Sequence, residues 1–140
     1  MNFKEQYRDL FTVEKSYYLA HCIASDFRMG AGIAVQFQKK FSLRKQLQET
    51  KLDTSPGSCV LIKKVFNLIT KRRSSGKPTY DTLQSSLDEM KRLCQEVGVE
   101  KIAMPKIGCG LDRLHWGRVK TMIQDTFKDL DVEILICNYK

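Results

Sequence analysis

The chain has 140 residues, of which 42% are hydrophobic and 29% charged, and these values are typical of one folded domain and exclude a disordered chain. Its apolar runs are far shorter than the roughly 18 residues that a membrane span requires, and its polar first residues are unlike a signal peptide. We therefore expect a single domain over residues 1–140 that is monomeric, has no contact with a membrane and is located in the cytoplasm, or also in the nucleus of a eukaryote.

The formal net charge of +8 favours contact with polyanions such as DNA or RNA, although a solvated basic face is the commoner reason for such an excess. The five cysteines are an odd number without a C-x-x-C pair. That pattern favours reduced, packed thiols over a disulfide framework. Because His, Cys and carboxylate residues do not cluster at ligand spacing, we expect no metal and no cofactor.

The first predicted elements are a buried strand and an amphipathic helix. Residues 17–23 form a short aromatic and apolar run, which is typical of a buried strand. From Ala31 onward, apolar residues recur at helical spacing. These residues are Ile33, Ala34, Phe37 and Phe41. Leu43 and Leu47 indicate a second, short helical segment.

A hairpin and a long helix follow. Residues 59–62 and 65–69 read as two strands joined across Lys63 and Lys64. The helix begins after Thr79, and its apolar positions alternate in steps of three and four until Gly98. These positions are Tyr80, Leu83, Leu87, Met90, Cys94 and Val97.

The last predicted elements are a strand at residues 101–104, an amphipathic helix with apolar positions between residues 119 and 130, and a strand at residues 132–137. Strands therefore alternate with helices along most of the chain. This alternation predicts an α/β fold whose central, largely parallel sheet is covered by helices on both faces.

The first segment that could bind a ligand lies between the strand at residues 17–23 and the helix that follows it. Its sequence is M-G-A-G-I, formed by Met29, Gly30, Ala31, Gly32 and Ile33. Glycine lets a ligand approach the backbone closely, and the amides at the start of a helix favour anions. Taken singly, such glycines are more often ordinary turn residues.

A second glycine-containing segment follows the strand at residues 101–104. It consists of Lys106, Ile107, Gly108, Cys109, Gly110 and Leu111. In an open α/β sheet, ligands bind beyond the carboxyl ends of the strands, so two such loops can flank one crevice. The pair of loops predicts a site for a diphosphate.

Three segments in this order, H-C-I-A-S-D-F-R-M-G-A-G-I-A, L-I-T-K-R-R-S-S-G-K-P-T-Y and M-P-K-I-G-C-G-L-D-R-L-H-W, resemble the macrodomain family, specifically its terminal ADP-ribose protein glycohydrolase branch. The resemblance spans nearly the whole chain. It implies a macrodomain-like three-layer αβα sandwich with a central mixed, largely parallel sheet. It also implies that the diphosphate belongs to ADP-ribose.

The resemblance assigns the catalytic roles to Lys71 and Asp112. Lys71 would attack the anomeric carbon of the distal ribose and form a covalent adduct, and Asp112 would act as the acid and base that resolves it. On the residues alone, Lys71 is one more charge in a basic run and Asp112 is a turn or helix-capping residue.

The resemblance places further ligand contacts outside the two loops. These residues are Asp9, Leu10, His21, Ala24, Asn138 and Tyr139. Asp9 would bind the adenine amino group, although by itself it reads as a surface or capping residue. A strand histidine such as His21 is more often a core residue than a catalyst, and Ala24 stands where human-type enzymes of this branch carry serine.

The sequence therefore predicts an ADP-ribosyl hydrolase that removes ADP-ribose from a protein glutamate ester or from DNA thymidine, with an acetyl ester also open. Two alternatives remain: a reader module that only binds ADP-ribose, and a basic nucleic-acid-binding domain. The expected partners are ADP-ribose and the ADP-ribosylated protein or DNA. Contacts with nucleic acid would come from Arg72, Arg73 and Lys77, which follow the predicted nucleophile.

Overall fold

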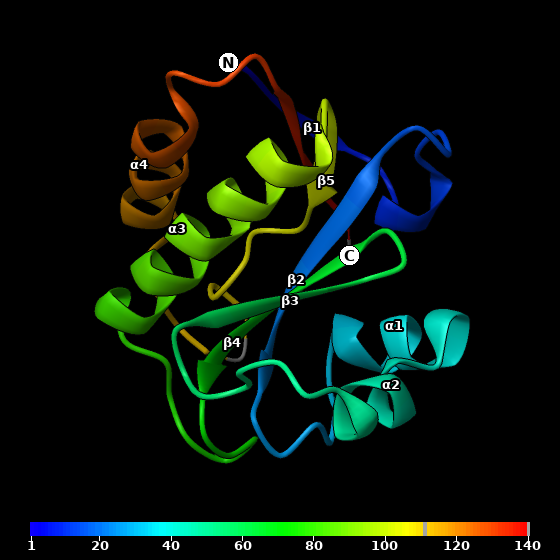
Figure 1. Ribbon diagram of the computed structural model, residues 1–140. Helices are drawn as coiled ribbons and strands as arrows, with labels where there is room; N and C mark the ends of the chain where they lie inside the picture. The colour runs from blue at the N-terminus through cyan, green and yellow to red at the C-terminus, as the bar shows by residue number, and fades with distance from the viewer. Residues whose placement is uncertain (111, 140) are drawn as a thin grey trace.

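The computed structural model describes residues 1–110 and 112–139, and within them six strands form one sheet (Figure 1). The strands are β1 (Asn2–Tyr7), β2 (Tyr18–Ala24), β3 (Ser58–Ile62), β4 (Val65–Lys71), β5 (Lys101–Met104) and β6 (Glu133–Asn138). Their order across the sheet is β1-β6-β5-β2-β4-β3. Neighbouring strands are parallel except in the antiparallel β3–β4 hairpin. The predicted mixed, largely parallel sheet is therefore confirmed.

Helices cover both faces of the sheet. In the described part of the chain they are η1 (Leu10–Thr12, a 3₁₀ helix), α1 (Ile33–Phe41), α2 (Leu43–Glu49), α3 (Tyr80–Val97) and α4 (Trp116–Phe127). Figure 1 shows α1 and α2 on one side of the sheet and α3 and α4 on the other, which confirms the predicted αβα layers. None of the helices in residues 1–110 and 112–139 is both long and apolar enough to span a bilayer.

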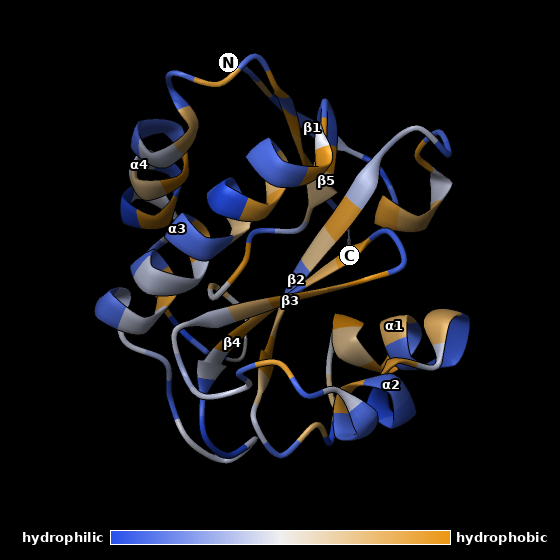
Figure 2. Cartoon of the chain, viewed as in Figure 1, coloured by the Kyte–Doolittle hydropathy of each residue, from blue (hydrophilic) through white to orange (hydrophobic). Residues whose placement is uncertain are grey.

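Two apolar cores lie on opposite faces of the sheet, and β4 contributes to both. Val65 and Ile69 pack into the core beneath α1 and α2, whereas Phe66 and Leu68 pack into the core beneath α3 and α4. All four side chains are fully buried. A strand covered on both faces is apolar along its length, which is why the sequence predicted it, and Figure 2 shows such strands between helices with hydrophilic outer faces.

The start of α3 is fixed to the end of β4. Thr79 caps the helix by accepting a hydrogen bond from the Thr82 amide (3.0 Å), and the Thr82 hydroxyl accepts one from the Thr79 amide (3.1 Å). The same hydroxyl donates to the Thr70 carbonyl oxygen (2.7 Å). At the other end Gly98 has a left-handed conformation (φ 81°), so both predicted ends of this helix are confirmed.

The sequence did not predict β1. Five of its six residues are exposed, and Phe3 is half-buried, so the strand does not alternate between apolar and polar side chains. Backbone pairing with β6 in parallel register holds it in the sheet. The first predicted helix also begins later than expected, at Ile33, because Gly32 has φ 62° and ψ −150°, which is not a helical conformation.

His21 lies in the core beneath α1. Its side chain is 1% exposed, its ring stacks on Phe37 with centroids 3.9 Å apart, and its Nε2 atom lies 2.7 Å from the Asn67 side-chain oxygen. Burial lowers the pKa of the imidazole to about 4, although the hydrogen bond to Asn67 opposes this effect.

This burial predicts a pH-dependent stability. In the unfolded chain His21 takes up a proton near pH 6.5, whereas in the folded chain it stays neutral until about pH 4. The free energy of unfolding should therefore fall between pH 6.5 and pH 4, by on the order of 3 kcal/mol at the lower end. Urea unfolding at several pH values measures this slope.

The His21→Gln variant should have a flatter slope, because glutamine can hydrogen-bond to Asn67 but does not titrate. His115→Gln, which replaces the exposed histidine, is the matched control and should keep the slope of the parent protein. Identical slopes in all three proteins would contradict the assignment to His21.

Candidate active site

Lys71 and Asp112, the two predicted catalytic residues, are in direct contact at the carboxyl end of β4. The Lys71 Nζ atom lies 2.5 Å from Asp112 Oδ1 and donates a second hydrogen bond to the Ser74 carbonyl oxygen (3.3 Å). The two side chains are only 13% and 15% exposed. Residues that lie 41 positions apart are thus joined into one charged pair that is largely screened from solvent.

A shift in strand register occurs where β4 ends in Lys71. Ile69 pairs with Ile23 of β2, but Lys71 pairs with Ala24, so Thr70 is an extra residue in β4. Such bulges change the direction of the side chains that follow them and are common beside active sites. Ala24, a predicted substrate contact, is thus the β2 partner of Lys71, and the residue is 5% exposed.

Asp26 joins the first glycine loop to the segment that follows Lys71, and sequence reasoning missed this residue. The Ser74 amide and hydroxyl each donate a hydrogen bond of 2.8 Å to its carboxylate. Burial opposes ionisation of Asp26, but the hydrogen bonds from Ser74 and Arg28 hold its pKa below the usual value. The anionic form therefore fixes Ser74, whose carbonyl accepts the hydrogen bond from Lys71. The sequence signal that could have indicated Asp26 was its position just after the strand predicted at residues 17–23.

The first glycine loop has an unusual backbone that ends at the start of α1. Phe27 and Met29 have positive φ angles of 55° and 47°, and both side chains are buried. The Arg44 guanidinium of α2 donates hydrogen bonds to the carbonyl oxygens of Phe27 (2.8 Å) and Arg28. These contacts hold the loop in a conformation that is costly for residues other than glycine.

The N-terminus of α1 is open to an anion. Gly32 occupies the capping position with φ 62°, no side chain caps the helix, and its first turn carries no acidic residue. Residues 30–32 are exposed, and Ile33 is half-buried. The first amides of a helix have no partner within the helix and favour negative charge. The predicted segment 29–33 therefore has the form of an anion site.

Backbone hydrogen bonds within the described residues close the second glycine loop. The Leu114 amide donates to the Gly108 carbonyl oxygen (2.8 Å), and Gly108 has a left-handed φ of 72°. A Cβ atom at this position would lie 3.0 Å from a Leu114 methyl group, so a larger residue would strain the turn. Of the predicted contacts, Ile107 is buried, Lys106 and Gly110 are exposed, and Leu111 lies outside the described residues.

Two thiols lie near the charged pair, but they are poor nucleophiles. Burial raises the pKa of the Cys22 thiol far above its ordinary value, and the charge of Asp112 adds to this effect. Burial likewise raises the pKa of Cys109 to about 11. Because the thiolate is the reactive form, both cysteines are unreactive at neutral pH. Lys71 remains the better candidate for a nucleophile at this place.

The predicted adenine contacts lie after β1. Asp9 caps η1 by accepting a hydrogen bond from the Phe11 amide (3.0 Å) through its Oδ1 atom. Leu10, the other predicted adenine contact, begins η1 and is 2% exposed. Arg8 donates a hydrogen bond to the Thr12 carbonyl oxygen (3.0 Å) and so supports the same turn.

Two exposed tyrosines mark the same edge of the sheet. Tyr139 is 63% exposed and Tyr7 is 73% exposed, and their ring centroids are 5.8 Å apart. Asn138 pairs with Tyr7 in the parallel register of β6 and β1. Because the carboxyl ends of parallel strands meet at one edge, these residues lie at the edge that carries Lys71. Tyr7 was missed because β1 was not predicted.

The remaining predicted residues are His21, which is buried, and three basic residues, which are exposed. The enclosed ring of His21 packs in the core and does not reach the surface at the site. Arg72, Arg73 and Lys77 follow Lys71, and all three are exposed. The structure thus brings Lys71, Asp112 and the two glycine loops to one edge of the sheet, with the basic segment beside them.

Comparisons with known proteins agree with this arrangement. The family model for the Macro domain matches residues 20–123. The human protein named ADP-ribose glycohydrolase OARD1 is 47% identical over 133 residues, which cover 91% of this chain and 86% of the human protein. The DNA ADP-ribosyl glycohydrolase of Thermus aquaticus is 28% identical over 120 residues, which cover 77% of this chain and 33% of that protein.

The fold is also found among solved structures. The macrodomain of Mycobacterium tuberculosis DarG superposes with a TM-score of 0.84 at 20% sequence identity, and the match covers 98% of this chain and 96% of that one. A likeness at this identity establishes the shared fold. Since the family model matches well over half of the sequence, this chain belongs to the Macro domain family, as its motifs predicted.

Proposed function

We propose that this protein is an ADP-ribose glycohydrolase that cleaves the bond between the distal ribose of ADP-ribose and a modified macromolecule. The observation that carries the proposal is the contact of 2.5 Å between Lys71 Nζ and Asp112 Oδ1, made by two largely buried side chains beside two glycine loops. The relative with 47% identity, which is itself named an ADP-ribose glycohydrolase, supports the same reaction.

The ligand would lie along the carboxyl edge of the sheet. The open N-terminus of α1 and the turn at Gly108 suit the two phosphates, because backbone amides and the helix dipole favour anions there. Asp9 would accept a hydrogen bond from the adenine amino group. This orientation leaves the distal ribose beside Lys71.

Lys71 and Asp112 divide the chemistry. The Asp112 carboxylate lies close enough to take the proton that the Lys71 amine must lose before it can attack. The amine then bonds to the anomeric carbon, and the bond from that carbon to the leaving oxygen or nitrogen breaks as the leaving atom receives the proton from Asp112. In the second half, Asp112 activates water, which displaces the Lys71 amine and releases free ADP-ribose.

A reader module that only binds ADP-ribose needs no buried charged pair at this place. Partly buried charges are costly to desolvate unless they are paired, so a binding module gains little from keeping both. A plain nucleic-acid-binding domain would use its basic surface but leave the open helix N-terminus and the glycine loops without a role. The hydrolase accounts for all of these features.

Free ADP-ribose should stabilise the protein. A ligand at 100 times its dissociation constant adds about 2.7 kcal/mol to the free energy of unfolding, which raises the melting temperature of a domain of this size by several degrees. Thermal unfolding with and without ADP-ribose measures the shift, and ribose 5-phosphate is the control that lacks the adenine and diphosphate. The absence of any shift at millimolar ADP-ribose would count against the proposed ligand.

Lys71→Ala should abolish turnover while affinity for ADP-ribose changes little, since the role proposed for Lys71 is covalent. Asp112→Ala should also stall turnover, because Asp112 acts in both halves of the reaction. Any protein that still completes the first half should remain as an adduct heavier by one ADP-ribosyl unit, less water, as intact-mass spectrometry would detect. Lys51→Ala removes an exposed lysine elsewhere and serves as the control for loss of charge. Full activity in Lys71→Ala would refute the mechanism.

The exposed basic segment beside Lys71 favours ADP-ribosylated DNA as one of two substrates. The other is a glutamate ester in protein. Arg73 and Lys77 flank Ser74, which the Asp26 carboxylate fixes through two hydrogen bonds of 2.8 Å. Cations on an anchored segment can contact the phosphates on either side of a modified base. The relative from Thermus aquaticus is named as an enzyme that acts on DNA.

If DNA is a substrate, replacing Arg73 and Lys77 with glutamine should slow cleavage of an ADP-ribosylated oligonucleotide. The salt dependence should also flatten, by about one in the log–log slope for each lost phosphate contact. Cleavage of a small ADP-ribosyl ester should change little, and a Lys45→Gln, Lys51→Gln double variant provides the same loss of charge at a distance from the site. Equal losses on both substrates would contradict a DNA contact.

A further inference from the structure

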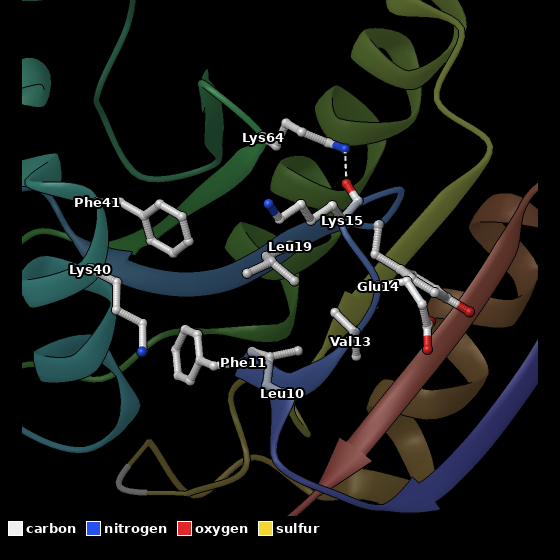
Figure 3. Close-up of a pocket in the computed structure, with 10 residues that line it drawn as sticks. Leu10, Phe11, Val13, Glu14, Lys15, Leu19, Lys40, Phe41 and Lys64 are labelled. Carbon is white, nitrogen blue, oxygen red and sulfur yellow. Dashed lines mark hydrogen bonds between the residues drawn. The ribbon is translucent and has the colours of Figure 1, made fainter.

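A cavity lies on the face of the sheet covered by α1, where β2 and β4 begin, with η1 in its wall (Figure 3). Its volume is about 320 Å³, and η1, the start of β2, the end of α1 and the β3–β4 turn line it. We call it the η1 pocket. Lys64 in its wall precedes β4, whereas Lys71 ends that strand, so about 20 Å of strand separate the pocket from the proposed active site.

The floor of the η1 pocket is apolar. Leu10 and Leu19 are almost fully buried, and the rings of Phe11 and Phe41 also line the pocket (Figure 3). Burying such a surface beneath a ligand is favourable because it removes apolar area from water. A pocket of about 300 Å³ or more is large enough for a small organic molecule.

The rim of the η1 pocket is basic. Lys15, Lys40 and Lys64 all line it, together with one acidic residue, Glu14. Lys40 Nζ lies 5.2 Å from the centre of the Phe11 ring, and Lys64 donates a hydrogen bond to the Lys15 carbonyl oxygen. The Glu14 carboxylate lies 3.7 Å from the Arg8 guanidinium, which offsets its charge, so the rim as a whole is positive.

We infer that the η1 pocket is a second ligand site, which binds a small apolar carboxylate with its hydrocarbon or aromatic body on the Leu10–Leu19 floor and its carboxylate among Lys15, Lys40 and Lys64. A neutral apolar molecule would cover the floor, but it would also displace water from the lysines without accepting the hydrogen bonds that this water accepted. A carboxylate supplies acceptors for charge-assisted hydrogen bonds at the same place. The combination of floor and rim therefore favours an anionic, amphipathic ligand.

Titration of the ¹⁵N-labelled protein with octanoate tests this inference. The amide signals of the pocket, such as those of Leu19, Lys40 and Lys64, should shift with one saturable binding curve, and they should do so whether or not ADP-ribose is present. 1-Octanol, which has the same chain without the charge, should bind at least about tenfold more weakly, since it cannot make charge-assisted hydrogen bonds to the lysines as a carboxylate does.

Variants separate the rim from the floor. Replacing Lys15 and Lys40 with glutamine should weaken octanoate binding about tenfold and leave octanol binding unchanged. Lys39→Gln, at the neighbouring exposed position of α1 that does not line the pocket, is the matched control. Val13→Phe should block both ligands by filling the pocket, and the lysine variants decide the matter if this variant does not fold.

Three outcomes would overturn the inference: shifts confined to other surfaces, equal affinity for octanoate and octanol, or displacement of octanoate by ADP-ribose. Because the signals are assigned to residues, a failure here is distinguishable from a failure of the proposed glycohydrolase activity. Loss of ADP-ribose binding would leave the shifts around Lys40 and Lys64 unchanged.

Discussion

The burial of β4 on both faces is the constraint on which the rest of the structure depends. Phe66, Leu68 and Ile69 have no exposed surface, so the strand holds the two apolar cores in fixed relation to each other. The register shift at Thr70 then ends the strand in Lys71. Because the buried strand ends in Lys71, the backbone of the proposed nucleophile is held in a fixed position. The loops that follow β2 and β5 surround this side chain.

Residues from three separate loops hold the charged pair of Lys71 and Asp112 in place. Asp112 follows β5, Ser74 follows β4, and Asp26, which binds Ser74, follows β2. Taken alone, Asp26, Ser74 and Asp112 are ordinary polar residues of their loops. Together they desolvate one lysine and one carboxylate to 13% and 15% exposure while keeping them paired, which is the arrangement in which burial of charge is tolerated.

Sequence reasoning succeeded where burial imposes a pattern and failed where backbone pairing or distant partners decide. The apolar run of β4 and the caps at Thr79 and Gly98 were predicted because such patterns are local. β1 was missed because its hydrogen bonds to β6 require no apolar side chain. Asp26 was missed because its partner lies 48 positions away. The roles of Lys71 and Asp112 came from the resemblance of motifs, while their contact became visible only in the fold.

The positive charge of the protein is divided between the two ends of the sheet, and this bears on what the charge means. Arg73 and Lys77 lie beside the carboxyl edge, whereas Lys15, Lys40 and Lys64 surround the pocket near the start of β2. A single surface for nucleic acid would gather these cations on one face. Two separate groups instead fit the two proposals, a polymeric anion beside the carboxyl edge and a small carboxylate in the η1 pocket. The total of +8 therefore does not report a single interaction, and only the position of each lysine or arginine indicates which ligand it serves.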